Sequence, residues 1–72
     1  MKNNKNRIRI LTNQQIDNCI MSAVEVEAWI LDKPDSIGCI HSYNNLTIKI
    51  GDEYFMRDNC TFFLRKNYFK LV

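Results

Sequence analysis

The stretch that decides the fold runs from Gly38 to Cys60 and reads "GCIHSYNNLTIKIGDEYFMRDNC". Short apolar runs alternate in it with pairs of turn-forming residues, which are "NN" at 44–45, "GD" at 51–52 and "DN" at 58–59. A Gly-Asp pair between two such runs is a hairpin signature, and the other pairs favour tight turns or bends. The stretch therefore predicts short strands joined by short loops, which favour an antiparallel meander.

Upstream of this stretch, "AVEVEAWIL" at 23–31 alternates between apolar and other side chains. Val24, Val26, Ala28 and Ile30 share one face, so the segment predicts a half-buried strand. The following "DKPDS" at 32–36 predicts a turn, because proline fixes φ and aspartates bond nearby amides. We expect the next strand to open at Gly38.

The segment before the first strand has the signals of a helix. Thr12 followed by Gln15 is a capping box, which marks a helix start. Ile16, Cys19 and Ile20 then recur at the spacing of one helical face, and the helix is expected to end near Ser22. The "RIRIL" at 7–11 alternates briefly and predicts a short extended segment.

One helix followed by five short strands predicts a mostly β, small α+β fold. Strands this short are best protected when the sheet bends strongly and closes, as in an SH3-like barrel. The 72 residues fit one domain. We expect a basic, largely disordered arm at 1–11, a folded domain at 12–66 and a tail at 67–72.

Charge is distributed unevenly along the chain. The ends hold seven of the ten basic residues, namely Lys2, Lys5, Arg7, Arg9, Arg65, Lys66 and Lys70. All eight acidic residues lie between Asp17 and Asp58. Basic ends on an acidic body are compatible with contact to a polyanion and equally with simple solubility.

Three cysteines, no secretory signal and no long apolar stretch lead us to expect a soluble, reduced protein of the cytoplasm. Cys39, His41 and Cys60 raise the question of a metal site. Zinc usually takes ligand pairs with longer spacing than C-x-H, and free cysteines commonly fill small apolar gaps. We expect no metal and no cofactor.

Catalysis by a Cys-His pair is also not expected. Residues two apart on a strand lie about 6–7 Å apart, which is beyond hydrogen-bond reach. The sequence contains no glycine-rich phosphate loop and no nucleophile elbow. These observations predict a protein that is not an enzyme.

The order of elements and several residues resemble the Sm-like fold and, in detail, the bacterial Hfq family of ring-forming RNA chaperones. "VEVEAWIL" fits the first strand of that family, and Gly38, Ile40, Tyr43 and Asn44 fall on its second-strand pattern. "MRDNCTFF" stands where the family has "YKHAISTF", so that Arg57-Asp58 replaces a Lys-His pair. The resemblance covers roughly residues 12–64.

The resemblance implies a homo-oligomeric ring, expected to be a hexamer, that binds single-stranded U-rich or A-rich RNA. It implies that six residues line the central pore of the ring, namely Gln14, Tyr43, Asn44, Asn45, Arg57 and Asp58. It places Trp29 where the opposite, distal face stacks bases. Lys2, Lys5, Arg7 and Arg9 would contact phosphates without sequence preference.

Two readings of function stay open at this point. In the first, the protein is an RNA chaperone in post-transcriptional regulation. In the second, a divergent ring serves as a protein-interaction hub with weak or no RNA binding. The basic N-terminal arm, Tyr43 and Arg57 favour RNA, whereas the loss of the Lys-His pair favours the hub.

Overall fold

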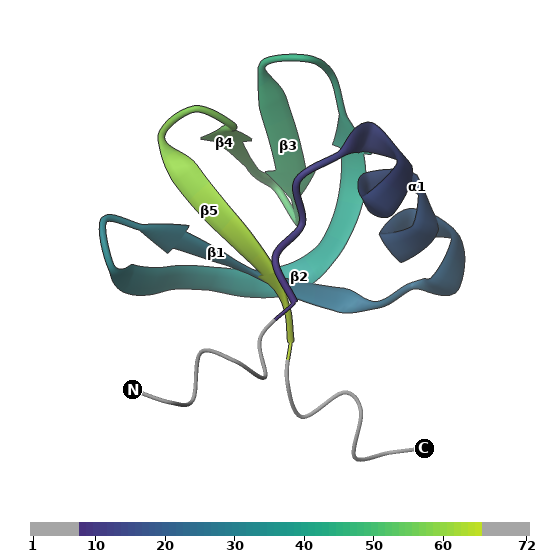
Figure 1. Cartoon of the computed structure of the whole chain (residues 1–72), viewed down its shortest axis with the longest axis horizontal. Coiled ribbons are helices and arrows are strands. Elements are labelled where there is room, and N and C mark those ends of the chain that lie inside the picture. The colour runs from purple at the N-terminus through teal and green to yellow at the C-terminus, as the bar shows by residue number, and fades with distance from the viewer. Residues whose placement is uncertain (1–7, 66–72) are drawn as a thin grey trace.

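The computed structural model describes residues 8–65, which form one helix followed by five strands (Figure 1). The elements are α1 (Asn13–Ser22), β1 (Glu25–Ile30), β2 (Lys33–Tyr43), β3 (Thr47–Ile50), β4 (Glu53–Met56) and β5 (Cys60–Leu64). The predicted mostly β, small α+β fold is confirmed.

The helix begins and ends where the sequence predicts. Thr12 is its N-cap, with the Gln15 N–H donating to Thr12 Oγ1 at 3.2 Å and the Thr12 N–H donating to Gln15 Oε1 at 3.0 Å. At the other end Ala23 takes a left-handed conformation with φ of 53° and closes the helix through its backbone N–H. Both ends are thus satisfied locally, which explains why local signals located them.

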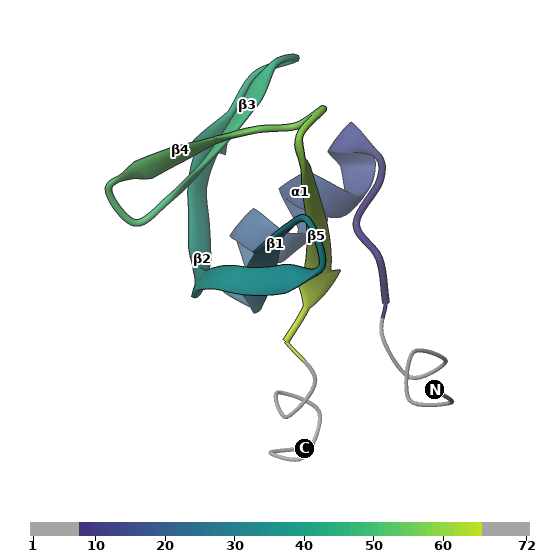
Figure 2. The same ribbon diagram turned by 90° about the vertical axis from the view of Figure 1, so that its left-hand side faces the viewer.

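The five strands form one antiparallel sheet in the order β4-β3-β2-β1-β5. The sheet is strongly bent, so that β2 is shared between two halves that face each other across the core (Figure 2). β4 and β5 are its edge strands, and within residues 8–65 they do not pair with each other. The sheet therefore stays open and does not complete a barrel.

The turn predicted at 32–36 is wrong, because β2 already begins at Lys33. Leu31 and Asp32 make the turn, and Leu31 has a positive φ of 57°. Pro34 lies inside the strand opposite Trp29, next to a register irregularity between Ala28 and Trp29. Proline is accommodated at such an irregularity because no ladder hydrogen bond is required from its nitrogen.

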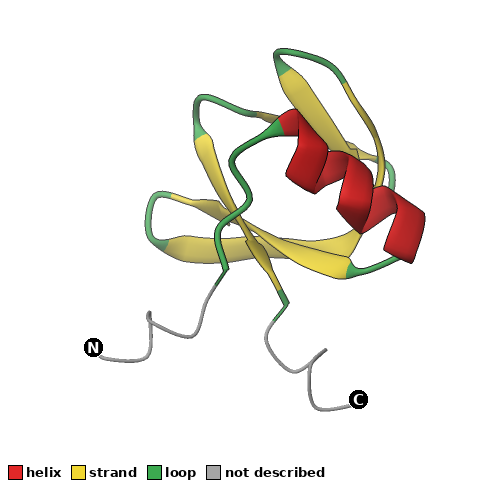
Figure 3. Ribbon diagram, turned by 45° about the vertical axis from the view of Figure 1, so that its right-hand side comes forward, coloured by secondary structure: helices red, strands yellow, loops and turns green. Residues whose placement is uncertain are grey.

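Gly38 therefore lies in the middle of β2 and does not open the strand. A Cβ atom at this position would lie 3.0 Å from Ile50 Cγ2 of β3, so glycine permits the close approach of the two strands. The core lies inside the bend, and α1 covers it beside β2 (Figure 3). Its buried residues are Ile10, Ile16, Cys19, Val26, Ala28, Ile40, Ile48, Ile50, Phe55 and Phe62.

Residues 8–10 lie along the outer edge of β5. The Ile10 N–H donates to the Phe62 carbonyl at 2.8 Å, and the Leu64 N–H donates to the Ile8 carbonyl at 2.9 Å. Arg9 lies opposite Phe63 in this bridge. This part of the predicted arm is extended, as its alternation indicates, and it covers the edge that β5 would otherwise expose.

Candidate nucleic-acid interface

The end of β2 and the β4–β5 turn bring Tyr43 and Arg57 together. The Arg57 guanidinium carbon lies 5.8 Å from the centroid of the Tyr43 ring, in a cation–π arrangement. Arg57 Nη1 also donates to the Asn44 carbonyl at 2.8 Å. The Tyr43 hydroxyl donates to Asp17 Oδ1 of α1 at 2.7 Å. These contacts fix the orientation of both side chains at the bend between β2 and β3.

Asn44 holds the bend itself. Its Oδ1 accepts hydrogen bonds from the backbone N–H groups of Leu46 and Thr47, both at 2.8 Å, and from Thr47 Oγ1 at 3.2 Å. An asparagine that bonds the backbone two or three residues ahead is a turn-forming residue. The Asn44 amide oxygen is therefore occupied by hydrogen bonds within the bend. The side chain of the next residue, Asn45, is exposed.

A cleft of about 500 Å³ opens between the start of α1, this bend and the β4–β5 turn. We call it the polar cleft. Its polar lining consists of Arg9, Asn13, Asn45, Arg57, Asp58 and Thr61, and its apolar lining of Ile10, Leu11, Ile16, Ile48, Cys60 and Phe62. Four of the site residues predicted from the sequence thus line one cleft, namely Arg9, Asn45, Arg57 and Asp58.

Two residues of the polar lining were missed by the sequence reasoning. Asn13 follows the N-cap directly, so its place at the helix start was a signal that pointed to it. Thr61 reaches the cleft through the pairing of β5 with β1, which no local pattern reveals. Gln14, in contrast, is exposed on α1 and does not line the polar cleft.

Trp29 of β1 lines a second cleft of about 490 Å³, which we call the aromatic cleft. Its indole makes an edge contact with Phe63 at 5.9 Å between ring centroids, and its Nε1 donates to Glu27 Oε1 at 3.0 Å. The complete lining is Arg9, Trp29, Leu31, Asp32, Asn59, Thr61 and Phe63. Arg9 and Thr61 line both clefts, so the two are neighbours on the surface.

The electrostatics of the described residues are mixed. Residues 8–65 carry eight acidic and five basic residues, a net charge of −3. Arg9, Arg57 and Asp58 all line the polar cleft, so charges of both signs meet there. The hydrogen bond to Asp17 raises the pKa of the Tyr43 hydroxyl, and Arg57 opposes this shift. The predicted phosphate contacts Lys2, Lys5 and Arg7 lie outside the described residues.

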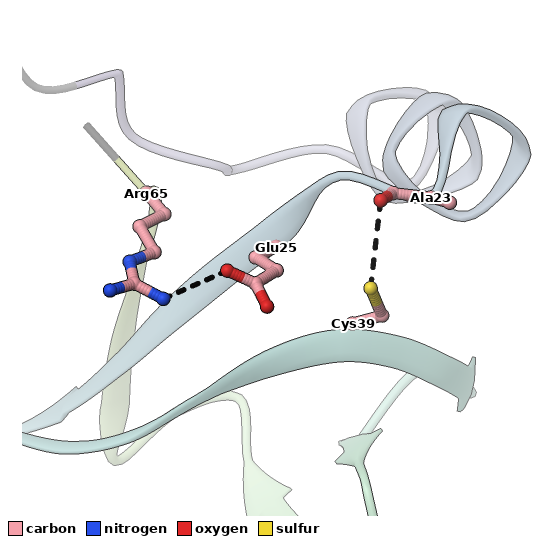
Figure 4. A network of polar contacts seen from close by, with 4 residues as sticks. All are labelled: Ala23, Glu25, Cys39 and Arg65. Atoms are coloured by element: carbon pink, nitrogen blue, oxygen red, sulfur yellow. Dashed lines mark hydrogen bonds and ion pairs between the residues drawn. The ribbon is translucent and has the colours of Figure 1, made fainter. Parts of the chain in front are cut away.

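The cysteines and the histidine do not converge. Cys39 Sγ donates to the Ala23 carbonyl at the helix end, at 3.6 Å, beside the ion pair of Glu25 with Arg65 (Figure 4). Burial raises the pKa values of the Cys19 and Cys60 thiols. Between residues 8 and 65, no group of three or more His, Cys, Asp or Glu side chains is placed to hold a metal ion.

Comparison of the chain with models of known protein families, with curated proteins and with solved structures gave no match. The fold and the clefts therefore carry the functional argument by themselves. The one helix in the part of the chain that the structure describes is neither long nor apolar enough to cross a membrane.

Proposed function

We propose that the protein binds single-stranded RNA in the polar cleft. The observation that carries the proposal is the convergence of two arginines, Arg9 and Arg57, with the amides of Asn13 and Asn45 in one open cleft. Arginine bonds phosphate or base edges through charge-assisted contacts, and amides read the donor and acceptor pattern of a base. The cleft volume of about 500 Å³ lies within the range of small-ligand sites.

Arg57 is the central residue of the proposed site. Its Nη1 donates to the Asn44 carbonyl, and its guanidinium carbon lies 5.8 Å from the centroid of the Tyr43 ring. Guanidinium carries five N–H donors in a planar fork, so donors remain for a nucleotide. A base that stacks beside the Tyr43–Arg57 pair would meet an aromatic edge and a cationic plane, which are the platforms that unpaired bases use.

The proposal includes the assembly and the setting that the resemblance implies. A homo-oligomer, expected to be a hexamer in the Hfq-like, Sm-like pattern, would multiply a weak site through avidity. The setting would be the cytoplasm, where an exposed free thiol such as Cys39 is kept reduced. The role would be that of an RNA chaperone in post-transcriptional regulation, with no catalytic step.

A protein-interaction hub is the second candidate function. It is favoured by the net charge of −3 on residues 8–65, which repels RNA outside the clefts. It is favoured as well by large apolar side chains at the surface, among which Leu31 is 85% and Met21 82% exposed. Such side chains suit contact with another protein better than contact with phosphates.

Fluorescence anisotropy with labelled U-rich, A-rich and duplex RNA separates the two candidates. We expect the single strands to bind better than the duplex and binding to weaken as salt rises, because bound cations displace counterions. Arg57→Ala should weaken binding by about 10- to 150-fold, the effect of losing one charge-assisted contact of about 1.5–3 kcal/mol.

Arg65→Ala is the matched control. Arg65 pairs with Glu25 at 2.8 Å and does not line the polar cleft, so its removal takes away one positive charge elsewhere. An equal loss for both variants would show that net charge, and not the cleft, holds the RNA. If the wild-type protein binds none of these RNAs even at low salt, the hub replaces the chaperone.

A further inference from the structure

Among the described residues that line the polar cleft, Asp58 alone is acidic. Its carboxylate repels the phosphates that Arg9 and Arg57 would attract, so its place in a cleft for RNA calls for a different partner. Within residues 8–65 the Asp58 side chain takes part in no hydrogen bond and no ion pair. Both of its oxygens are therefore available to a ligand.

Backbone bonds, and not the Asp58 side chain, hold the β4–β5 turn in place. The Arg57 N–H donates to the Leu46 carbonyl at 2.8 Å, and the Asn59 N–H donates to the Met56 carbonyl at 3.1 Å. These two bonds fix the residues on either side of Asp58. Aspartate often occurs in turns because its side chain accepts from a nearby amide, but no described amide donates to this one. The structure of the turn thus does not account for an aspartate at this position.

An ionised carboxylate accepts hydrogen bonds through two adjacent oxygens and donates none. Guanine matches it, because the ring N–H and the neighbouring amino group give this base two adjacent donors on its pairing edge. Uracil has a single N–H there, between two carbonyl oxygens. Adenine and cytosine have an amino group beside an unprotonated ring nitrogen. In these three bases, the second carboxylate oxygen would meet a lone pair instead of a donor.

The cleft also supplies donors for the acceptors of guanine, which are its carbonyl oxygen and its N7 nitrogen. The Asn13 and Asn45 side chains are exposed at the cleft, and no described residue bonds their amides. Each amide carries two N–H donors. Arg9 and Arg57 then remain for the phosphates, which they would bind without regard to sequence.

We propose that the polar cleft takes a guanine base and that Asp58 recognises it by accepting hydrogen bonds from the ring N–H and the amino group. The inference rests on the proposed function, the binding of single-stranded RNA in this cleft, and adds the base that the cleft selects. The strand on either side of this base can be U-rich or A-rich. Asp58 is thereby a specificity-determining residue, whereas the arginines provide affinity.

Fluorescence anisotropy with matched strands tests the proposal. A labelled U-rich strand is compared with the same strand carrying one central guanosine, and with a third strand carrying inosine at that place. Inosine differs from guanosine only in lacking the amino group, so it keeps one of the two donors. We expect guanosine to tighten binding about 5- to 150-fold over the plain strand, the discrimination typical of one bidentate base contact, and inosine to give less.

Asp58→Asn replaces one carboxylate oxygen by an NH₂ group of similar size. The advantage of guanosine should be lost, whereas the plain U-rich strand should bind at least as tightly, because one charge that repels phosphate is gone. A purely structural role of Asp58 would weaken all three strands alike. Asp52→Asn is the matched control, because Asp52 lies in the β3–β4 turn and lines neither cleft. This variant removes the same charge and should leave the advantage of guanosine intact.

Two outcomes overturn the guanine site and leave the proposed function standing. In the first, the wild-type protein binds all three strands with equal affinity. In the second, the advantage of guanosine persists in Asp58→Asn, which would assign the recognition to another residue.

Free nucleotides separate this inference from the proposed function. If none of the strands binds even at low salt, RNA binding is overturned, and NMR titration of the full chain with guanosine and inosine monophosphate decides the guanine site. A preference for guanosine monophosphate that is lost in Asp58→Asn would support a site for the free nucleotide. Equal shifts with the two nucleotides, or none with either, would overturn guanine recognition as well.

Discussion

Replacing Gly38 by alanine tests whether the bend in β2 depends on close contact with β3. The new Cβ would lie 3.0 Å from Ile50 Cγ2, which is closer than ordinary van der Waals contact. Ile50 is 5% exposed and β-branched in a strand, so it has little freedom to move away. The bend bears on the proposed site because β2 ends at Tyr43, and Arg57 of the polar cleft lies 5.8 Å from the centroid of the Tyr43 ring.

The size of the effect follows from two opposing contributions. Overpacking of a core position typically costs about 1–3 kcal/mol. Alanine reduces the entropy of the unfolded chain relative to glycine and returns about 0.4–1 kcal/mol. We therefore expect a net loss of about 0.5–2 kcal/mol, measured by urea unfolding. In a thermal melt a domain of this size loses about 4–8 °C per kcal/mol.

A double-mutant cycle with Ile50 identifies the cause. Ile50→Leu moves the branch away from Cβ and removes the contacting methyl group, so it should recover part of the stability lost in Gly38→Ala. Ile50→Val keeps a γ-methyl group at that place and should recover none. Gly38→Ala with unchanged stability, or equal rescue by leucine and valine, would refute the role of this contact.

Three further predictions concern the helix and Tyr43. Thr12→Ala should cost about 1 kcal/mol of stability in urea unfolding, because it removes the N-cap bond to Gln15; no loss would show that the cap contributes nothing. Ala23→Gly should stabilise the fold by about 0.5–1 kcal/mol, because alanine has a φ of 53° there and glycine does not resist it; a loss in the same assay would contradict this. The bond to Asp17 raises the Tyr43 pKa, so its contribution to stability is present below the ordinary tyrosine pKa of about 10 and is lost as pH rises above it. Tyr43→Phe should flatten this part of the pH–stability curve, and an unchanged curve would assign the slope to other groups.

Local signals located the elements that depend on neighbouring residues. The capping box at Thr12 and Gln15 lies entirely within one helical turn, and the predicted helix matches the observed one. The Gly51-Asp52 hairpin is equally local, since Gly51 takes the positive φ of 61° that the turn requires. Such features need no knowledge of the tertiary structure, and so the order of helix and strands was predictable.

The turn after β1 shows where local signals mislead. Pro34 and its neighbouring aspartates have the composition of a turn, yet the chain reverses at Leu31, which is 85% exposed and has a positive φ of 57°. Leucine is a rare choice there, because a left-handed conformation costs a residue with a Cβ about 1–2 kcal/mol. The pairing of β1 with β2 decides the position of the turn, and that pairing is not local.

The polar cleft required both resemblance and tertiary structure. Tyr43 and Arg57 are far apart in the chain, and only the pattern of the resembled family placed them together in advance. Asn13 lies at the helix start, which the capping box predicts, whereas Thr61 reaches the cleft through the pairing of β5 with β1, which no spacing in the sequence reveals. Residues that meet across a bent sheet are predictable only as far as their strand register is known.

The position of Arg9 links the uneven charge of the sequence to the clefts. Its neighbours Ile8 and Ile10 are bound to β5 by backbone hydrogen bonds, so the backbone fixes where Arg9 lies. Arg9 lines both the polar and the aromatic cleft as a consequence. Lys2, Lys5 and Arg7 precede this fixed segment in the sequence, whereas residues 8–65 carry a net charge of −3. Arg9 therefore places one positive charge of the basic N-terminal segment beside both clefts, which is the charge that the proposed contact with RNA would use.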